Sequence, residues 1–254
     1  MNNLSVVIIA LNEADNLAPL MDALSWADEV LVIDSGSTDG TQNLCAGYPN
    51  CRIIEQPFLG YGPQKRFGVE RARHDWILSI DADEVPDTLM QGAIRTLLRD
   101  GFGDNAGFHL SRRLSFLGRE FRHGKESGQR ILRLFDRRKG NYTPAVVHEK
   151  VEVEGAVGEL DGRLIHNSYR DLGDYFSKFN RYTSLMAKQM YDRGGRAHRI
   201  GIVLRPPWVF LQYYLLRGNF LNGFAGFVYA LLTAHYKTVK YLKLYELNMQ
   251  VEHN

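Results

Sequence analysis

The chain has 254 residues, enough for one sizeable hydrophobic core and a smaller appended region. Hydrophobic residues make up 44% of it and charged residues 24%, a globular balance that excludes a disordered or fibrous protein. The two cysteines are too few for a disulfide scaffold and lack the spacing of a metal knuckle, so we expect reduced thiols in the cytoplasm. No basic segment precedes the first apolar run, so we expect no secretory signal.

The net charge of +2 hides an uneven distribution. Residues 193–245 contain eight basic side chains and no acidic one, whereas all 29 acidic residues lie elsewhere in the chain. Such a segment is expected to meet an anionic partner.

Strands and helices alternate over about the first hundred residues. Residues 4–10, 29–33, 52–55 and 76–80 are apolar, β-branched runs typical of parallel strands that are buried on both faces. Helical spacing lies between and after them, at residues 17–24, 63–73 and 86–98. This pattern predicts a doubly wound α/β sheet with a ligand site beyond the carboxyl ends of its strands.

Two features mark the expected helix starts. Asn12 and Asp15 are candidate caps for the first helix, and Pro63 opens the second, where its missing amide costs nothing.

The second half divides into a strand-rich and a helical part. Residues 106–166 have the character of short strands and loops, with strands expected at 108–110, 130–135 and 146–153. A helix is expected over residues 172–190, ended by Gly194-Gly195. We therefore expect a catalytic domain over residues 1–168 and a helical C-terminal region over residues 169–254.

An acidic triplet, Asp81-Ala82-Asp83, follows the expected strand at residues 76–80. Two carboxylates so close are costly unless a cation lies between them or the loop is solvated. A divalent metal with a diphosphate fits, because Mg²⁺ and Mn²⁺ prefer hard oxygen ligands. The alternative is an acidic turn that caps the next helix. Asn12-Glu13 and Asp34 also follow expected strands and should reach the same edge of the sheet, which favours the ligand site.

Polar residues end three of the expected strands in a specific order and spacing. The segments are Ser5-Val-Val-Ile-Ile-Ala-Leu-Asn-Glu, Val32-Ile-Asp-Ser-Gly-Ser-Thr-Asp-Gly-Thr and Trp76-Ile-Leu-Ser-Ile-Asp-Ala-Asp-Glu. Together they resemble the GT-A glycosyltransferases of family 2. Gly60-Tyr-Gly-Pro-Gln-Lys-Arg and Val147-His-Glu extend the resemblance to inverting enzymes that add a sugar, typically glucose, to a heptose of the lipopolysaccharide inner core. The resemblance implies a Rossmann-like mixed α/β sheet.

The resemblance also implies a site for a UDP-sugar donor and a divalent metal, Mg²⁺ or Mn²⁺. The donor-binding residues that it implies are Ala10, Leu11, Asn12, Glu13, Asp34, Lys65, Asp81 and Ala82. The implied metal ligands are Asp83 and His166. Three alternatives stay open: Asp34 as a turn residue, Lys65 as a solvated helix residue, and His166 as a histidine held in a loop.

An inverting transfer needs a base that takes the proton of the acceptor hydroxyl as it attacks the sugar. Glu149 is the candidate base, although many family members carry Asp there in a Glu-Asp pair. The alternative for Glu149 is an ion pair with Lys150 or another neighbour. His148 is expected to orient the base or the acceptor.

A basic belt is expected between the acidic triplet and the candidate base. Its members are Arg112, Arg113, Arg119, Arg122, His123, Lys125, Arg130 and Arg133. Arginine suits a phosphorylated acceptor, and Arg112 and Arg130 are the candidate acceptor residues. The alternative is ordinary solvated charge. Nucleic acid is not expected, because aromatic residues do not alternate with these cations.

Two uncharged, aromatic-rich stretches, residues 206–216 and 218–236, lie in the C-terminal region. The second is near the length that spans a bilayer, but asparagines, a histidine and glycines weaken its drive to insert. With their flanking cations, these stretches favour in-plane attachment to an anionic membrane surface. The alternative is a helical hairpin packed on the catalytic domain, or a dimer interface.

The pattern as a whole predicts an inverting glycosyltransferase. It would move a hexose, expected to be glucose, from a UDP-sugar to a lipid-linked acceptor, expected to be a lipopolysaccharide inner-core heptose. We expect it to lie peripherally on the cytoplasmic face of the inner membrane. Two alternatives remain: a polyprenyl-phosphate glycosyltransferase, and a non-catalytic membrane-binding module on a nucleotide-binding fold.

Overall fold

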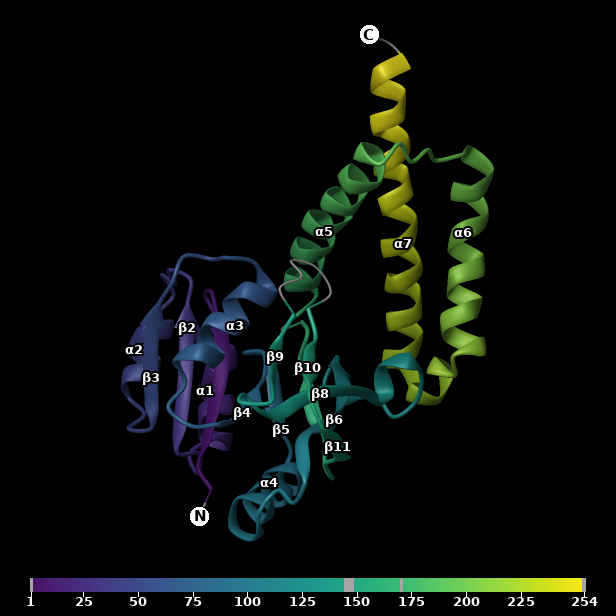
Figure 1. Ribbon diagram of the computed structural model, residues 1–254. Helices are drawn as coiled ribbons and strands as arrows, with labels where there is room; N and C mark the ends of the chain where they lie inside the picture. Colours follow the sequence, from purple (N-terminus) through teal and green to yellow (C-terminus); the bar gives the residue numbers. More distant parts are fainter. Residues whose placement is uncertain (1, 144–148, 170, 253–254) are drawn as a thin grey trace. The chain divides into compact units, whose positions relative to one another are not determined.

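The computed structural model describes residues 2–143, 149–169 and 171–252. Its chain divides into two compact units (Figure 1). The first unit comprises residues 1–113 and 128–166, and the second comprises residues 114–127 and 167–254.

Four parallel strands form one side of the sheet in the first unit. They are β1 (Leu4–Ala10), β2 (Glu29–Asp34), β3 (Cys51–Glu55) and β4 (Trp76–Ser79), in the order β3-β2-β1-β4 (Figure 1). Because side chains alternate between the two faces of a strand, Val6 and Ile8 enter one core while Val7 enters another. These strands have continuous apolar sequences because both faces of the sheet pack against a hydrophobic core.

Helices cover both faces of these strands. The helices α1 (Ala14–Ala23), α2 (Thr41–Ala46) and α4 (Thr88–Asp100) contribute to the core that contains Val6. Helix α3 (Tyr61–Arg71) packs in the core that contains Val7. A Cβ on Gly68 of α3 would lie 2.5 Å from Val7 Cγ1, so this close approach requires glycine.

The expected caps of the first helix were wrong. Glu13 is the N-cap residue of α1, and no side chain caps that end with a hydrogen bond. Asn12 has a left-handed backbone, φ 58°, and its side-chain oxygen accepts a hydrogen bond from the amide of Thr38 instead. A contact with the next loop has replaced the local cap.

The other side of the sheet is mostly antiparallel and contains longer strands than expected. Its path continues from β4 through β8 (Gln129–Asp136), β6 (Asn105–Phe116), β12 (Leu164–His166) and β5 (Glu84–Pro86). The expected strand at residues 108–110 is confirmed as part of the longer β6, which has 12 residues and pairs with β7 (Arg119–Glu120), β8 and β11 (Ala156–Glu159).

A separate hairpin joins β9 (Gly140–Tyr142) to β10 (Val151–Val153). The expected strand at residues 146–153 is described only from residue 149, because residues 144–148 lie outside the described part. A short 3-10 helix, η1 (Lys125–Ser127), precedes β8.

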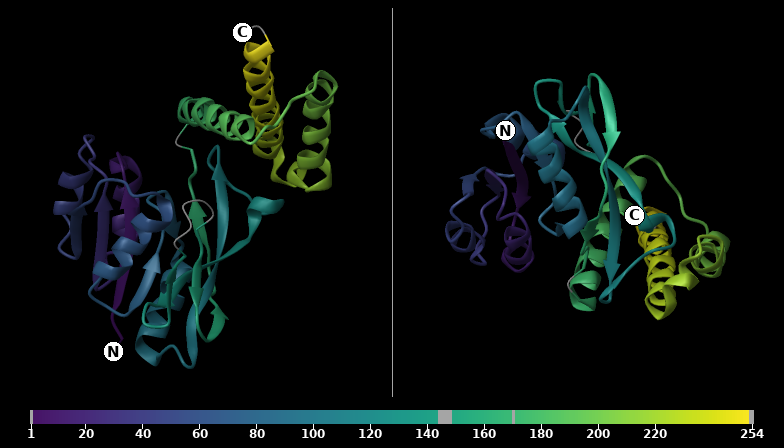
Figure 2. Two further views of the ribbon diagram at one scale, coloured as in Figure 1. Left: turned by 45° about the horizontal axis from the view of Figure 1, so that its top comes forward. Right: turned by 90° about the horizontal axis from the view of Figure 1, so that it is seen from below.

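The second unit is mostly helical. It contains α5 (Leu172–Asp192), α6 (Arg199–Leu211), the π-helical turn η2 (Gln212–Leu216), the 3-10 turn η3 (Asn219–Asn222) and α7 (Gly223–Glu252). Both views in Figure 2 show α6 beside α7. Among the described residues, no helix combines the length and apolar character that crossing a bilayer requires. The predicted α/β class, with a mixed sheet and a helical C-terminal region, is confirmed.

Candidate active site

The loops that follow β1 and β2 lock together through hydrogen bonds. The amide of Asn12 donates to Ser37 Oγ at 2.8 Å, and the amide of Thr38 donates to Asn12 Oδ1 at 2.8 Å. The amide of Ala14 donates to Asp39 Oδ2 at 3.0 Å. Because β1 and β2 are parallel neighbours, both loops leave the same edge of the sheet. The structure thus brings the expected donor residues of β1, Ala10 to Glu13, beside Asp34.

Asp34 is fully buried at the end of β2. Its Oδ2 accepts hydrogen bonds from Gln42 Nε2 at 2.8 Å and from the amide of Ser37 at 3.0 Å, and the Ser37 hydroxyl donates to its Oδ1. Burial by itself would raise the pKa of Asp34, but these hydrogen bonds lower it below its usual value. In this structure Asp34 is therefore a charged residue that holds its own turn, and its contact with a base or ribose stays a prediction.

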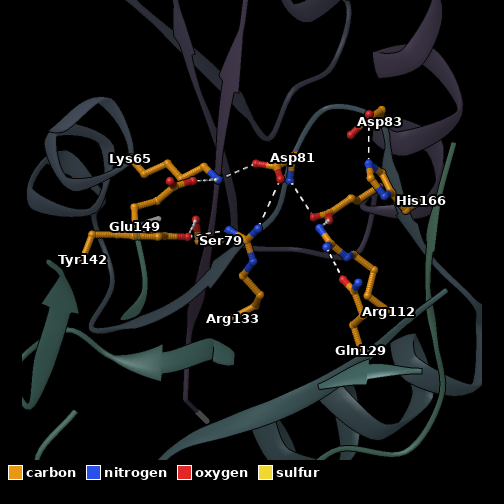
Figure 3. Close-up of polar contacts among 11 residues, drawn as sticks. Lys65, Ser79, Asp81, Asp83, Arg112, Gln129, Arg133, Tyr142, Glu149 and His166 are labelled. Carbon is orange, nitrogen blue, oxygen red and sulfur yellow. Dashed lines mark hydrogen bonds and ion pairs between the residues drawn. The ribbon is translucent and has the colours of Figure 1, made fainter. Parts of the chain in front are cut away.

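Lys65 lies between two carboxylates (Figure 3). Its Nζ is 2.7 Å from Asp81 Oδ1 and 3.3 Å from Glu149 Oε1, and its side chain is 4% exposed. Burial would lower the pKa of Lys65, but the charge of Asp81 raises it above its usual value. The alternative of a solvated helix residue was wrong, because α3 directs Lys65 into the site.

Arg133 of β8 is the second cation beside Asp81 (Figure 3). Its Nη2 is 3.1 Å from Asp81 Oδ2, and its Nη1 donates to the hydroxyl of Tyr142 at 2.7 Å. The Tyr142 hydroxyl in turn donates to Ser79 Oγ at 2.8 Å. Burial would raise the pKa of Asp81, but Arg133 and Lys65 hold it well below its usual range. Asp81 is therefore ionised and fixed from two sides.

Glu149 reaches this group from the far end of the hairpin loop. Its ion pair is with Lys65 of α3, 84 positions away in the sequence, and not with the adjacent Lys150. Its side chain remains 21% exposed. The structure thus places the candidate base beside Asp81 through a shared lysine. The neighbouring candidate, His148, lies outside the described residues.

Asp83 and His166 face each other (Figure 3). The distance between His166 Nε2 and Asp83 Oδ2 is 3.2 Å. The antiparallel pairing of β12 with β5 sets His166 opposite Glu84, next to Asp83, so His166 lies in a strand and not in a loop. Its role as a metal ligand stays a prediction. A carboxylate oxygen and an imidazole nitrogen that converge in this way fit a divalent cation. Within the described part of the chain, no group of three or more potential metal-binding side chains occurs, so phosphate oxygens or water would complete the shell.

The acidic triplet does not cap a helix. Asp87 is the N-cap residue of α4, and its Oδ1 accepts a hydrogen bond from the amide of Met90 at 2.8 Å. The buried Glu84 instead accepts a hydrogen bond from the amide of Asp81 at 2.9 Å. The alternative of a capping turn was therefore wrong, and the triplet is held as a loop with Ala82 buried in the core.

The basic belt is not one surface. Arg112 contacts Glu84 Oε1 at 3.1 Å and also donates to Gln129, while the exposed Arg130 pairs with Glu159 at 2.8 Å. Arg133 is buried at the site, although it had been grouped with the surface belt. The members at positions 119–125 belong to the second unit. The belt residues thus come from different strands and from both units, and their role toward a phosphorylated acceptor stays a prediction.

The structure adds four residues to the predicted site: Arg133, Tyr142, Ser79 and Glu84. A signal was available for Arg133, which lies inside the expected apolar strand at residues 130–135. An arginine in such a strand is seldom buried without a partner. No comparable signal marked Tyr142, because its role depends on the fold of the hairpin.

Comparisons with known proteins show to which family the chain belongs. Residues 5–149 match the sequence profile of the family described as Glycosyl transferase family 2. The chain is 33% identical over 250 residues to the lipopolysaccharide core biosynthesis glycosyltransferase LpsC of Rhizobium meliloti, covering 96% of this chain and 92% of that protein. It is 26% identical over 261 residues to an uncharacterized glycosyltransferase of Rickettsia typhi, covering 98% and 89%.

A solved structure is also similar over part of the chain. It is glucosyl-3-phosphoglycerate synthase from Mycobacterium tuberculosis in complex with Mn²⁺, UDP and glucosyl-3-phosphoglycerate. The TM-score is 0.36 with 26% identity, covering 45% of this chain and 44% of that one, which is too low to bear on the site. The profile match over more than half of the sequence and the full-length similarity to LpsC are decisive: the chain is an enzyme that belongs to glycosyl transferase family 2.

Proposed function

We propose that this enzyme transfers a hexose, glucose, from a UDP-sugar to a heptose of the lipopolysaccharide inner core, with inversion at the anomeric carbon. The observation that carries the proposal is the convergence at one sheet edge of the Asp83 and His166 pair with the Lys65, Asp81 and Glu149 group. The similarity to LpsC, a lipopolysaccharide core biosynthesis glycosyltransferase, supports the acceptor class.

The donor would bind over the interlocked loops. Ala10, Leu11, Asn12 and Glu13 line one side of that edge, and Leu11 is exposed there. Beside them, Asp81 and Ala82 follow the carboxyl end of β4, and Lys65 contacts Asp81. Asp34 holds the loop after β2 in place. The fixed hydrogen bonds of these loops favour a preformed nucleotide site.

Asp83 and His166 would hold the divalent metal. Bound there, Mg²⁺ or Mn²⁺ would neutralise charge on the leaving diphosphate. The protein itself supplies the pairing of β5 with β12, which fixes the distance between these two ligands.

Glu149 would act as the base. Its carboxylate would take the proton of the acceptor hydroxyl while that oxygen bonds to the anomeric carbon and the bond to UDP breaks. Lys65 holds Glu149 near Asp81, because its ammonium group contacts both carboxylates. Arg112 and Arg130, together with His148, are proposed to receive the acceptor.

The catalytic domain is proposed to cover residues 1–168, and the helical region over residues 169–254 to attach the enzyme peripherally to the cytoplasmic face of the inner membrane. The acid-free segment at residues 193–245 supports attachment to an anionic surface.

Transfer assays with a panel of nucleotide sugars test this function. We expect UDP-glucose with Mg²⁺ or Mn²⁺ to label an inner-core acceptor that lacks the sugar, and proton NMR of the product to show the inverted linkage. Labelling of polyprenyl phosphate in place of the core acceptor would contradict the proposal. Equal transfer after removal of divalent metal by a chelator would contradict the metal assignment.

A further inference from the structure

Helix α6 leaves most of its apolar surface uncovered. Only Val209 is buried among its residues. The exposed side chains include Ile200, Leu204, Trp208 and Leu211, and Leu215 follows in η2. Their spacing of three or four positions sets them along one side of the helix, over a length of about 20 Å. We call this surface the α6 stripe; Ile200 is 75% and Trp208 is 59% exposed.

Aromatic contacts connect α6 with exposed residues of η3 and α7. The ring of Phe227 lies 5.6 Å from that of Phe210 and 5.7 Å from that of Tyr214. Phe227 also stacks on Phe224, which is 76% exposed. Exposed apolar surface therefore continues from one helix to the other, whereas soluble monomers rarely show large continuous patches of this kind.

Cations border this surface without carboxylates in the same segment. Arg217 and Lys237 both lie over the ring of Tyr213, at 4.1 and 4.6 Å, and Arg205 lies 3.6 Å from the ring of Tyr241. The buried atoms Arg205 Nε and Arg217 Nη1 have no hydrogen-bond partner among the described residues. Residues 193–245 contain no Asp or Glu, so the segment itself supplies no carboxylate to these cations. Such a segment favours an anionic partner.

A basic recess lies at the start of α6. A cavity of about 380 Å³ there is lined by Arg196, His198, Arg199 and Tyr245, among others. Cations therefore flank both the beginning of the α6 stripe and its end at Arg217.

We propose that the α6 stripe, with Phe224 and Phe227, inserts into the headgroup region of an anionic phospholipid leaflet, with α6 parallel to the membrane plane. This inference rests on the membrane partner of the proposed function and identifies the surface that makes the contact. Exposed leucine and aromatic side chains enter the boundary of the acyl chains, while the arginine and lysine side chains meet lipid phosphates. Tryptophan is a residue type that favours this depth.

The charge pattern argues for lipid over a second copy of the chain. A symmetric dimer through the α6 stripe would bring the same surface of each copy together. Arg205, Arg217 and Lys237 would then meet cations of the partner, and like charges across an interface oppose binding. An anionic leaflet can bury the apolar side chains of the α6 stripe and also supply phosphate groups that bind the cations.

Flotation with lipid vesicles tests the surface. We expect the full chain to float with vesicles that contain phosphatidylglycerol and much less with pure phosphatidylcholine. The substitutions Leu204→Ser and Leu215→Ser should each weaken binding about tenfold. Arg217→Gln should weaken it about fivefold, with less effect at high salt. Leu89→Ser is the matched control, because Leu89 is 63% exposed but belongs to α4 of the first unit.

Fluorescence quenching tests the depth of insertion. The chain has three tryptophans, of which Trp76 is buried and Trp26 packs against the core of the first unit, so the exposed Trp208 should report on lipid. We expect acyl-brominated phosphatidylglycerol to quench the emission, and Trp208→Phe to remove that quenching. No flotation with anionic vesicles at low salt would overturn the inference. So would a dimer in light scattering that Leu204→Ser dissociates, with no vesicle binding.

Donor hydrolysis, measured on the same samples, separates this inference from the proposed function. Hydrolysis of UDP-glucose without vesicle binding would overturn the membrane surface alone. Vesicle binding and tryptophan quenching without activity on any nucleotide sugar would overturn the proposed function and leave the surface intact.

Discussion

Cations in the two units of the chain have different kinds of partner. In the first unit, Lys65 and Arg133 lie against Asp81, and each cation also holds a second polar partner. In the second unit, Arg217 and Lys237 lie against the ring of Tyr213, within a segment that contains no carboxylate. The difference teaches that charge in the first unit fixes the side chains of the proposed active site, whereas the charge of Arg217 and Lys237 is left for the membrane partner that we propose.

The energetics of these two arrangements differ. Removing one member of a buried ion pair leaves an uncompensated charge and costs about 3 to 5 kcal/mol. A cation on an aromatic ring contributes only about 0.5 to 2 kcal/mol. Substitutions of the same kind in the two units should therefore give different results.

The largest effect should come from the proposed base at the end of the ion-pair group. Glu149→Gln removes the proton acceptor but keeps the shape of the side chain, so we expect transfer to fall by about 10²- to 10⁴-fold. Binding of UDP, measured by calorimetry, should change little. Glu152→Gln, an exposed substitution three positions away in β10, is the control and should retain activity. Near-normal turnover in Glu149→Gln would eliminate the assignment.

A matched arginine pair tests the comparison through stability. Arg133→Gln removes a largely buried cation from the half-buried Asp81, so we expect the free energy of unfolding in urea to fall by about 3 kcal/mol. Arg217→Gln should change it by less than about 1 kcal/mol, because only a contact with Tyr213 is lost and the nearby Lys237 is relieved of a like charge. Equal losses in the two variants would show that the units do not differ in this respect.

The pH dependence of stability tests whether other buried charges of the first unit are also stabilised by polar partners. Glu29 is fully buried and accepts hydrogen bonds from the amide of Arg73 at 2.7 Å, from Ser5 Oγ at 2.6 Å and from Arg52 Nη2 at 2.7 Å. Burial would raise its pKa, but these bonds lower it below its usual value of 4.5.

A carboxyl group with a lowered pKa stabilises the folded state above its unfolded pKa, and this contribution is lost as the pH falls through the folded value. We therefore expect Glu29→Gln to cost about 2 kcal/mol at pH 7 and progressively less below about pH 4.5. Urea unfolding of both proteins across this range is the measurement. A difference between wild type and variant that stays constant down to pH 3 would contradict the role of Glu29.

Local sequence patterns were sufficient for the parallel half of the sheet and for α5. Continuous β-branched runs predict buried strands because both faces of a central parallel strand meet apolar partners, as β1 and β2 do. The polar residues after β1, β2 and β4 could be assigned to one edge, since parallel strands end on the same side. The local pattern predicted a helix cap at Asn12, and this was wrong. The side chain of Asn12 accepts a hydrogen bond from Thr38, 26 positions away, and not from the helix.

The sequence by itself determined the family, the order of strands and helices in the first hundred residues, and the residues expected at the donor site. Only the tertiary structure decided how those residues are held. Lys65 meets Glu149 across 84 positions, and His166 meets Asp83 through the pairing of β12 with β5. Such contacts depend on strand register and helix orientation, which no local pattern specifies, so the acidic triplet could not be distinguished from a helix cap until Asp87 was found at the cap.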